Sequence, residues 1–257
     1  MRRGTRLYLS SAPVKSAKPF SRRRELRAIK ERLSLSEVKE RCTNREAHWA
    51  LPLDLFEPDK MKPKAEETLE RYGHVDILVN NGGISIRALA SETTLEIDRR
   101  IIEIDYFGHI ALTKAVLPSM LQRKEGHIVV TTSLMGIMPA PLRSAYWVAK
   151  HALHGFFDTL RTEVWQDNIK VTLICPSVVR TNISKSALTG NGERFGRMDN
   201  LISSGISPED CAREIMRAIV KGKREVIVGG GVPRYGAYVN RWFPALYDRL
   251  VRRATVV

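Results

Sequence analysis

The sequence predicts a doubly wound α/β domain, in which helices cover both faces of a parallel sheet. Short β-branched runs alternate with longer amphipathic stretches from residue 48 onward, and small or polar residues follow the runs. The chain has 257 residues, of which 43% are hydrophobic, enough for one large domain with a sizeable core. These observations favour a single Rossmann-like domain.

The first 45 residues differ from the rest of the chain in charge. They contain fourteen Lys or Arg and four Asp or Glu, so they carry +10 of the formal net charge of +14. Residues 1–20 have no helical periodicity, and we predict no structure for them. Apolar residues recur at three- and four-residue steps in residues 21–45, which predicts a basic amphipathic helix or helix pair. Because the remainder carries only +4, we expect no nucleic-acid partner.

Strands and helices then alternate along the chain. Apolar, β-branched runs predict strands at residues 48–55, 75–80, 126–133, 169–176 and 225–228. Apolar periodicity predicts helices at residues 58–72, 95–123, 144–166 and 208–221. Ser207 and Pro208 suit the N-cap and first position of the last helix. The glycine- and asparagine-rich residues 181–205 predict a loop long enough to act as a lid.

Three segments follow from these patterns: a basic segment at 1–20, the α/β domain at 21–233, and an aromatic, basic tail at 234–257. Within the tail, five arginines stand among aromatic residues, and Pro244 breaks the helical pattern. One interpretation is that residues 234–253 lie on a membrane surface or cap a lipid-sized pocket. The other is that they pack on the core or on a neighbouring subunit.

The cysteines and the apolar runs bear on the compartment. The three cysteines are far apart and have no C-x-x-C spacing, so we expect neither a disulfide framework nor a metal site. No uninterrupted apolar run approaches the ~18 residues of a membrane span, and the N-terminus lacks the apolar core of a signal peptide. We expect a cytoplasmic protein, with membrane association through the tail as an alternative.

Tyr146 and Lys150 are the first candidates for catalysis. They are four residues apart in a predicted helix, so both lie on one helical face. An ammonium group beside a phenol stabilises the phenolate and makes the tyrosine usable as an acid or base. Ser133 could hydrogen-bond a substrate oxygen as charge develops on it. The same spacing also occurs by chance, in which case these are ordinary helix residues.

Several other polar residues are expected at the same edge of the sheet. Ligands of parallel α/β sheets bind beyond the carboxyl ends of the strands. The predicted strands deliver to that edge Asp54, Asn80 to Gly83, Ser133, and Pro176 to Thr181. Together with Tyr146 and Lys150, these residues resemble the short-chain dehydrogenase/reductase family over about residues 21–232.

The resemblance implies NAD(P)H-dependent interconversion of a ketone and a secondary alcohol. It implies that Tyr146 protonates the alkoxide, Lys150 stabilises the phenolate and holds the nicotinamide ribose, and Ser133 polarises the carbonyl. Further cofactor-binding positions implied by the family are Asp54, Asn80, Gly82 and Thr181. Other motifs resemble a subgroup associated with lipid-like carbonyls. The family commonly pairs the helices expected at 95–123 and 144–166, so we expect a homodimer or homotetramer.

Arg22 and Arg23 bear on the choice of cofactor. Either one matches the basic pair that follows the second strand of the family, where it would pair with a 2′-phosphate. This match favours NADP, with NAD as the alternative. The competing interpretation is that both arginines lie on a solvated basic helix face.

The N-terminal region departs from the family pattern. Gly4 is the only glycine before Gly73, so the glycine-rich turn that cradles the pyrophosphate is missing. If Leu7 to Leu9 formed the first strand, the eleven residues from Ser10 to Phe20 could not hold a turn, a helix and a second strand. We therefore expect an incomplete first βαβ unit. Its origin would be a truncated or frame-shifted reading frame, a splice product, or a protein that has given up dinucleotide binding.

Asp105 is the second departure. The family usually has an asparagine there, which helps to order a proton-relay water near the lysine. A carboxylate would anchor Lys150 or misplace the relay, or it is a tolerated isosteric change. The two departures define the alternative function, in which the chain is an N-terminally truncated, catalytically silent remnant that acts as a binding or interaction protein.

Overall fold

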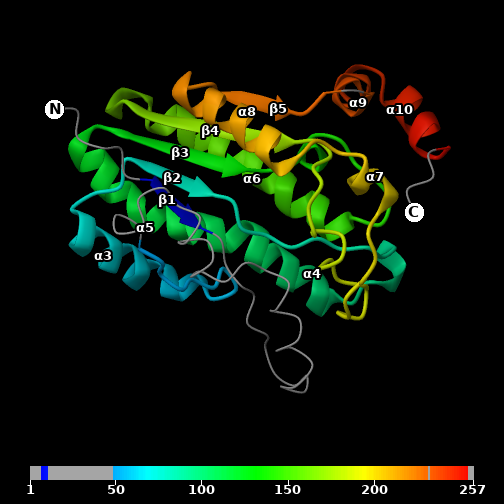
Figure 1. Cartoon of the computed structure of the whole chain (residues 1–257), viewed down its shortest axis with the longest axis horizontal. Helices are drawn as coiled ribbons and strands as arrows, with labels where there is room; N and C mark the ends of the chain where they lie inside the picture. The colour runs from blue at the N-terminus through cyan, green and yellow to red at the C-terminus, as the bar shows by residue number, and fades with distance from the viewer. Residues whose placement is uncertain (1–6, 11–48, 231, 254–257) are drawn as a thin grey trace.

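The computed structural model describes residues 7–10, 49–230 and 232–253, and the described strands form one five-stranded parallel sheet (Figure 1). The strand order in the sheet is the order in the chain: β1 (Leu7–Ser10), β2 (Ile77–Asn80), β3 (Gly126–Thr131), β4 (Ile169–Pro176) and β5 (Glu225–Val228). With its flanking helices, this sheet confirms the predicted doubly wound α/β class.

The helices follow the predicted alternation, with some differences at their ends. In chain order they are η2 (Pro58–Lys60), α3 (Met61–Tyr72), η3 (Ala90–Glu92), α4 (Leu95–Ile102), η4 (Glu103–Phe107), α5 (Gly108–Arg123), η5 (Leu134–Gly136), α6 (Ser144–Glu163), η6 (Trp165–Asp167), α7 (Asn200–Ser203), α8 (Pro208–Val220), α9 (Val232–Trp242) and α10 (Pro244–Val251). None of the helices in the described ranges is long and apolar enough to cross a membrane.

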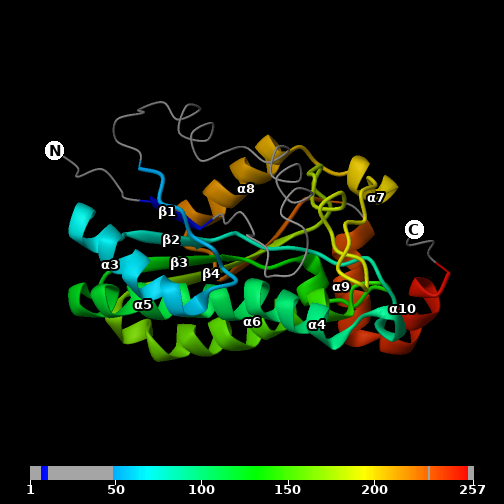
Figure 2. The same ribbon diagram turned by 90° about the horizontal axis from the view of Figure 1, so that it is seen from below.

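Both faces of the sheet are covered (Figure 2). Leu78 and Leu173 belong to the larger core, which α5 and α6 cover on one face. Their strand neighbours Val79 and Ile174 belong to a second cluster, which Cys211 and other α8 residues complete on the opposite face. Because successive strand residues point to opposite faces, burial on both sides explains why these strands are continuously apolar.

β1 lies in the part of the chain for which we predicted no structure. Leu7 pairs with Ile77 and Ser10 with Asn80 in parallel register, so the carboxyl ends of β1 and β2 lie side by side. Parallel strands require a crossover connection. That connection, residues 11–48, lies outside the described residues, as does the helix predicted at 21–45.

The strand predicted at residues 48–55 is wrong for its described part, because residues 49–54 form no regular element and a turn follows. The Asp54 carboxylate accepts the backbone N–H of Phe56 at 3.0 Å, and the Asp54 carbonyl accepts that of Glu57 at 3.0 Å. Such a turn satisfies backbone groups locally and competes with strand pairing. Pro52 also lacks the N–H that a sheet ladder needs.

The single helix predicted at 95–123 contains a π-helical segment, η4, between α4 and α5. π-helical turns are rare and occur frequently at functional sites, since they shift the register of the helix by one residue. In η4 the buried side chains are those of Ile104 and Asp105. The irregularity therefore accompanies a buried carboxylate.

The predicted lid, residues 181–205, is held to the body of the domain and includes α7. The N–H of Arg87 donates to the Leu188 carbonyl, and the N–H of Leu188 donates to the Ser85 carbonyl, both at 2.8 Å. Beyond β5, the tail forms α9 and α10, which meet at Phe243 and Pro244. The break predicted at Pro244 is thus observed.

Candidate active site

Tyr146 and Lys150 lie on one face of α6, close to its N-terminal end. Both residues are buried, and the Lys150 Nζ is 5.5 Å from the centroid of the Tyr146 ring. A cation at this distance from a ring is attracted electrostatically by the ring. The geometry therefore places a positive charge beside the phenol, as the four-residue spacing predicts.

Asp105 supplies the counter-charge of this lysine. Its Oδ2 is 3.3 Å from the Lys150 Nζ, and its Oδ1 accepts the N–H of Ile84 at 2.8 Å. The turn after β2 is built around this carboxylate, since a Cβ added to Gly83 would lie 3.1 Å from each of its oxygens. The carboxylate thus connects the π-helical segment, the turn after β2 and α6.

The charges of this pair follow from its burial. Burial raises the pKa of Asp105, against the opposing effects of the Lys150 charge and the Ile84 N–H. Burial lowers the pKa of Lys150, but the Asp105 carboxylate and Tyr146 together oppose that effect and leave the pKa above its ordinary value. Lys150 is therefore an ammonium at neutral pH, and Asp105 offsets part of its field.

Asn80 ends β2 and begins a buried hydrogen-bond network. Its Nδ2 donates to the Thr113 hydroxyl at 2.9 Å, and that hydroxyl donates to the His109 carbonyl at 2.8 Å. The His109 Nε2 is 2.9 Å from the Gly82 carbonyl, which can only accept, so Nε2 carries the proton. Burial, aided by the Lys150 charge, lowers the pKa of His109 to about 3 and keeps the ring neutral.

His109 and Thr113 are additions to the predicted site. They are four residues apart on α5, and together they hold the amide of Asn80 and the backbone of Gly82. The available sequence signal was this spacing of two polar residues in an otherwise apolar helix. The partner turn is 27 residues away from His109, so the spacing alone could not identify what they contact.

Ser133 lies between β3 and η5. Its hydroxyl oxygen accepts the N–H of Met135 at 3.1 Å and so caps η5, which packs against α6. A ring nitrogen of His151 is 2.8 Å from the Gly136 carbonyl and holds the two elements together. Ser133 is therefore on the segment that faces the helix of Tyr146.

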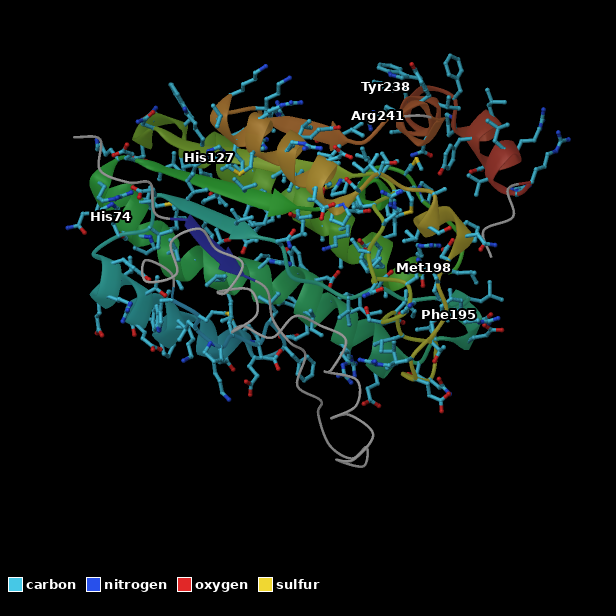
Figure 3. The ribbon with its side chains drawn as sticks, in the orientation of Figure 1. His74, His127, Phe195, Met198, Tyr238 and Arg241 are labelled. Atoms are coloured by element: carbon cyan, nitrogen blue, oxygen red, sulfur yellow. The ribbon has the colours of Figure 1, made fainter. Side chains whose placement is uncertain are left out.

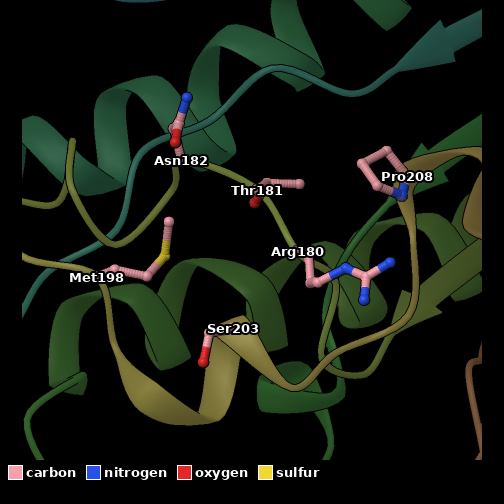
Figure 4. A pocket seen from close by; sticks show the side chains of 6 residues that line it. All are labelled: Arg180, Thr181, Asn182, Met198, Ser203 and Pro208. Atoms are coloured by element: carbon pink, nitrogen blue, oxygen red, sulfur yellow. The ribbon is translucent and has the colours of Figure 1, made fainter.

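Thr181 lies at the start of the lid. It is exposed and lines a cavity of about 470 Å³ (Figure 4). The residues lining the cavity are Arg180, Thr181, Asn182, Met198, Ser203 and Pro208, and thus include none of the other predicted site residues. Asp54 contributes to its local turn, while Arg22 and Arg23 lie outside the described residues.

A buried charge cluster holds the lid near Tyr146. The Asp199 Oδ2 is 3.1 Å from the Arg143 Nη2 and 3.5 Å from the Arg87 Nη2, and all three side chains are at most 8% exposed. Burial and the charge of Arg143 lower the pKa of Arg87 to about 10, so it remains charged at neutral pH. Asp199 is 112 residues from Arg87. The sequence therefore offers no signal for this pairing.

One group of side chains in the described ranges combines residue types that can bind a metal ion. Ligand atoms of His154, Cys175 and Glu225 lie within 4.8 Å of one another. Burial raises the pKa of Cys175 to about 12, and the Thr132 hydroxyl is 3.3 Å from its sulfur. The thiol is therefore protonated at neutral pH, and metals bind the thiolate.

The residues present fit one part of a nicotinamide dinucleotide. The Oδ1 of Asn80 is buried without a hydrogen-bond partner, which suits a bound group that donates a hydrogen bond. The ammonium of Lys150 suits ribose hydroxyls. No glycine lies between Gly4 and Gly73, so the sequence lacks the usual pyrophosphate turn after β1. The fit is therefore to the nicotinamide ribose half.

Comparison with known proteins gives a consistent result. The chain matches the family model of short chain dehydrogenases over residues 26–192. Dehydrogenase/reductase SDR family member 7B of Mus musculus is 42% identical over 203 residues, which cover 79% of this chain and 63% of that protein. Dehydrogenase/reductase SDR family protein 7-like of Anopheles gambiae is 45% identical over 203 residues, 79% of this chain and 64% of the relative. The chain thus spans less than two thirds of the length of these relatives.

Solved structures agree in fold. A short-chain dehydrogenase from Streptomyces avermitilis has a TM-score of 0.65 and 29% identity, covering 79% of this chain and 78% of its own. A short chain dehydrogenase/reductase from Burkholderia phymatum, solved in complex with NAD, has a TM-score of 0.65 and 20% identity, covering 77% and 76% respectively. The second likeness is one of fold alone.

Proposed function

Because the chain belongs to the short-chain dehydrogenase family, we propose that it is an NADP-dependent oxidoreductase that interconverts a ketone and a secondary alcohol. NAD is the alternative cofactor. The observation that carries the proposal is the buried Lys150 ammonium, 5.5 Å from the Tyr146 ring and held by Asp105. A phenol beside a fixed positive charge is suited to proton transfer.

In the proposed reduction, Tyr146 donates its hydroxyl proton to the substrate oxygen. A nicotinamide, when bound, would supply the hydride for the carbonyl carbon, and Tyr146 would protonate the oxygen that receives the C=O electron pair. Lys150 stabilises the phenolate that remains, because its ammonium lies beside the ring. Ser133 donates a hydrogen bond to the same oxygen and polarises the carbonyl. Oxidation of the alcohol is the reverse sequence.

The residues proposed to hold the cofactor come from several segments of the chain. Lys150 would bind the ribose hydroxyls, and Asn80 would accept a hydrogen bond through its unpartnered Oδ1. Thr181 would contact the nicotinamide side and Gly82 the backbone of the turn. Asp54 is proposed for the adenine, and Arg22 or Arg23 for a 2′-phosphate, which is the basis for preferring NADP.

A lipid-like substrate is the proposed class. The sequence resembles a subgroup associated with lipid-like carbonyls, and the cavity of about 470 Å³ beside Thr181 includes the apolar side chain of Met198. Pockets of this size accommodate a molecule larger than a simple ketone. We also propose a homodimer or homotetramer that pairs through the helical region Leu95–Arg123, which holds α4, η4 and α5, and through α6.

The alternative proposal is a catalytically silent member of the family that acts as a binding protein. Two observations favour it, namely the absence of glycine between Gly4 and Gly73 and the carboxylate at Asp105. Both concern features on which the reaction depends. The retained Tyr146 and Lys150 geometry favours the enzyme.

Calorimetric titration with NADPH and NADH separates the two proposals. The enzyme proposal expects binding, with NADPH the tighter ligand, and turnover of a ketone that Tyr146→Phe abolishes while cofactor affinity is nearly unchanged. Phenylalanine keeps the ring and removes only the proton donor. Absence of binding at millimolar concentrations of both cofactors would support the silent protein, and normal turnover by Tyr146→Phe would refute the role of the tyrosine.

A further inference from the structure

Each of the two tail helices exposes apolar side chains. α9 presents Tyr235, Tyr238 and Trp242 at positions i, i+3 and i+7, which lie on one side of a helix. Phe243, Leu246 and Leu250 repeat the same spacing at the start of and along α10. All six side chains are between 48% and 72% exposed. We call these six residues, together with the arginines beside them, the tail surface.

Contacts with the segment after η5 fix the position of the two helices. The Tyr247 hydroxyl donates to the Pro139 carbonyl at 2.6 Å, and the Asn240 Nδ2 donates to the Ile137 carbonyl at 3.2 Å. At Gly236 an added Cβ would lie 3.1 Å from the Met138 sulfur, so α9 sits close to the same segment. α9 is therefore attached by one side and leaves Tyr235, Tyr238 and Trp242 on the outer side, while on α10 the exposed fractions of Phe243, Leu246 and Leu250 show that they remain accessible beside the buried Tyr247.

The tail surface is also strongly basic. Its four arginines are Arg241, Arg249, Arg252 and Arg253. Asp248 is the one acidic residue beside them, so these five residues carry a net charge of +3. Three of the arginines, with Ala245 and Asp248, line a surface hollow of about 370 Å³. Figure 3 places Tyr238 and Arg241 at the outer end of the molecule. Arginines thus neighbour the exposed apolar side chains, since Arg241 is three residues after Tyr238 and Arg249 three residues after Leu246.

We propose that the tail surface docks on the headgroup region of an anionic lipid bilayer. Tyrosine and tryptophan rings have an apolar body and a polar tip, which suits them to the boundary between headgroups and acyl chains. Arginines on the same face are attracted by the negative potential of anionic lipids. The hollow is lined by three arginines and by Asp248, so its net charge is positive and opposite to that of a lipid phosphate.

A second copy of the chain is a poorer occupant of this surface. In a two-fold symmetric dimer the same patch meets itself, so four arginines would face four arginines. Like charges brought together in a buried interface oppose association. An anionic bilayer provides the apolar layer and the opposite charge at once, and therefore satisfies both features.

Docking would bring the candidate active site close to the membrane. The carbonyls that anchor α9 and α10 belong to Ile137 and Pro139, in the segment that follows η5 and Ser133. A lipid-like substrate would then reach the site from the bilayer. Docking itself rests only on the tail surface, so its failure would leave the proposed reaction untouched.

Co-sedimentation of the full chain with vesicles tests the proposal. One set contains phosphatidylcholine alone, and the other contains about one third phosphatidylserine. We expect binding to the anionic vesicles to be about tenfold tighter or more. The double variant Trp242→Ala with Phe243→Ala should weaken it by about tenfold, because it removes two interfacial rings. The matched control is Trp165→Ala. Trp165 is 69% exposed and lies just after the C-terminal end of α6, outside the tail surface.

A second measurement reads the position of the ring directly. Phosphatidylcholine brominated on its acyl chains, mixed into the anionic vesicles, should quench the fluorescence of Trp242, and Trp242→Phe should remove most of the quenching while Trp165→Phe does not. Circular dichroism and Tm confirm that each variant is folded. Equal vesicle binding by wild type and the double variant overturns the proposal. Failure of the wild type to bind also overturns it, and so does a double variant that loses a dimer without changing vesicle binding.

Discussion

At the residue scale, the candidate site differs from the usual family pattern in one charge, because Asp105 stands where the family usually has an asparagine. Asp105 has almost the shape of an asparagine, and its Oδ1 accepts the Ile84 N–H as an asparagine oxygen could. Its second oxygen, 3.3 Å from the Lys150 Nζ, carries the difference, because it places a negative charge against the ammonium that would stabilise a Tyr146 phenolate. Asp105 therefore holds the lysine in place and weakens its effect at the same time.

Asp105→Asn should shift the pH dependence of alcohol oxidation. Removing the carboxylate leaves the positive field of Lys150 unopposed, which favours the phenolate, so the rising limb of kcat/KM should move to lower pH by about one unit. Asn retains the acceptor for Ile84. Measuring kcat/KM against pH for both proteins tests this expectation.

The control for that experiment is Asp76→Asn, which removes a carboxylate at the amino end of β2, away from the site. Its profile should match that of the wild type. If the limb of Asp105→Asn stays in place or moves to higher pH, Asp105 does not oppose Lys150 in the manner described.

At the scale of the element, the start of α5 packs closely against the turn that follows Asp54. Gly108 opens α5 directly after the π-helical segment, and a Cβ added there would lie 2.4 Å from the Leu55 carbonyl oxygen. Because the obstacle is backbone, a rotamer change cannot relieve it. Asp105, three residues before Gly108, is buried in the adjoining π-helical segment.

Gly108→Ala should destabilise the protein by about 1–3 kcal/mol despite the better helix propensity of alanine. The matched variant is Gly155→Ala in α6, where an added Cβ meets nothing within 4 Å. That change should stabilise by up to about 1 kcal/mol. Urea unfolding of the three proteins measures both effects. Equal stabilities of the two variants would show that the contact with Leu55 relaxes without cost.

At the scale of the whole molecule, two groups of exposed apolar side chains differ in character. The tail surface is basic, whereas Phe107 on η4 and Val148 on α6 are 48% and 47% exposed on neighbouring helices. The second group lies on the helices expected to pair between subunits. The two surfaces are therefore proposed for different partners, a bilayer and another copy of the chain.

Phe107→Asp should convert the proposed dimer into a monomer, because a buried interface would then contain an unpaired charge. Sedimentation equilibrium measures the mass. The control is Val220→Asp, which places the same charge at an apolar residue that is 80% exposed and ends α8 on the other face of the sheet. A monomeric wild type, or a Phe107→Asp protein of unchanged mass, would contradict the expected interface.

Local interactions were predictable from the sequence. β2 to β5 were predicted because strands that pack against helices on both faces are rich in apolar, β-branched residues. The start of α8 was predicted because the Ser207 hydroxyl accepts the Asp210 N–H at 3.0 Å, a bond between close neighbours. The approach of Lys150 to Tyr146 follows in the same way from one turn of helix.

Contacts between distant residues were decided only by the tertiary structure. β1 pairs with β2, some seventy residues later in the chain. The apolar pattern of residues 48–55 predicted a strand, but an irregular segment and the Asp54 turn are found in its described part. The Arg87–Arg143–Asp199 cluster and the packing of Leu55 against Gly108 join segments far apart in the chain. The sequence by itself determined the fold class and the tyrosine–lysine face, because periodicity and spacing report local geometry. The charge environment of that face required the folded chain, because electrostatic partners are chosen by proximity in space.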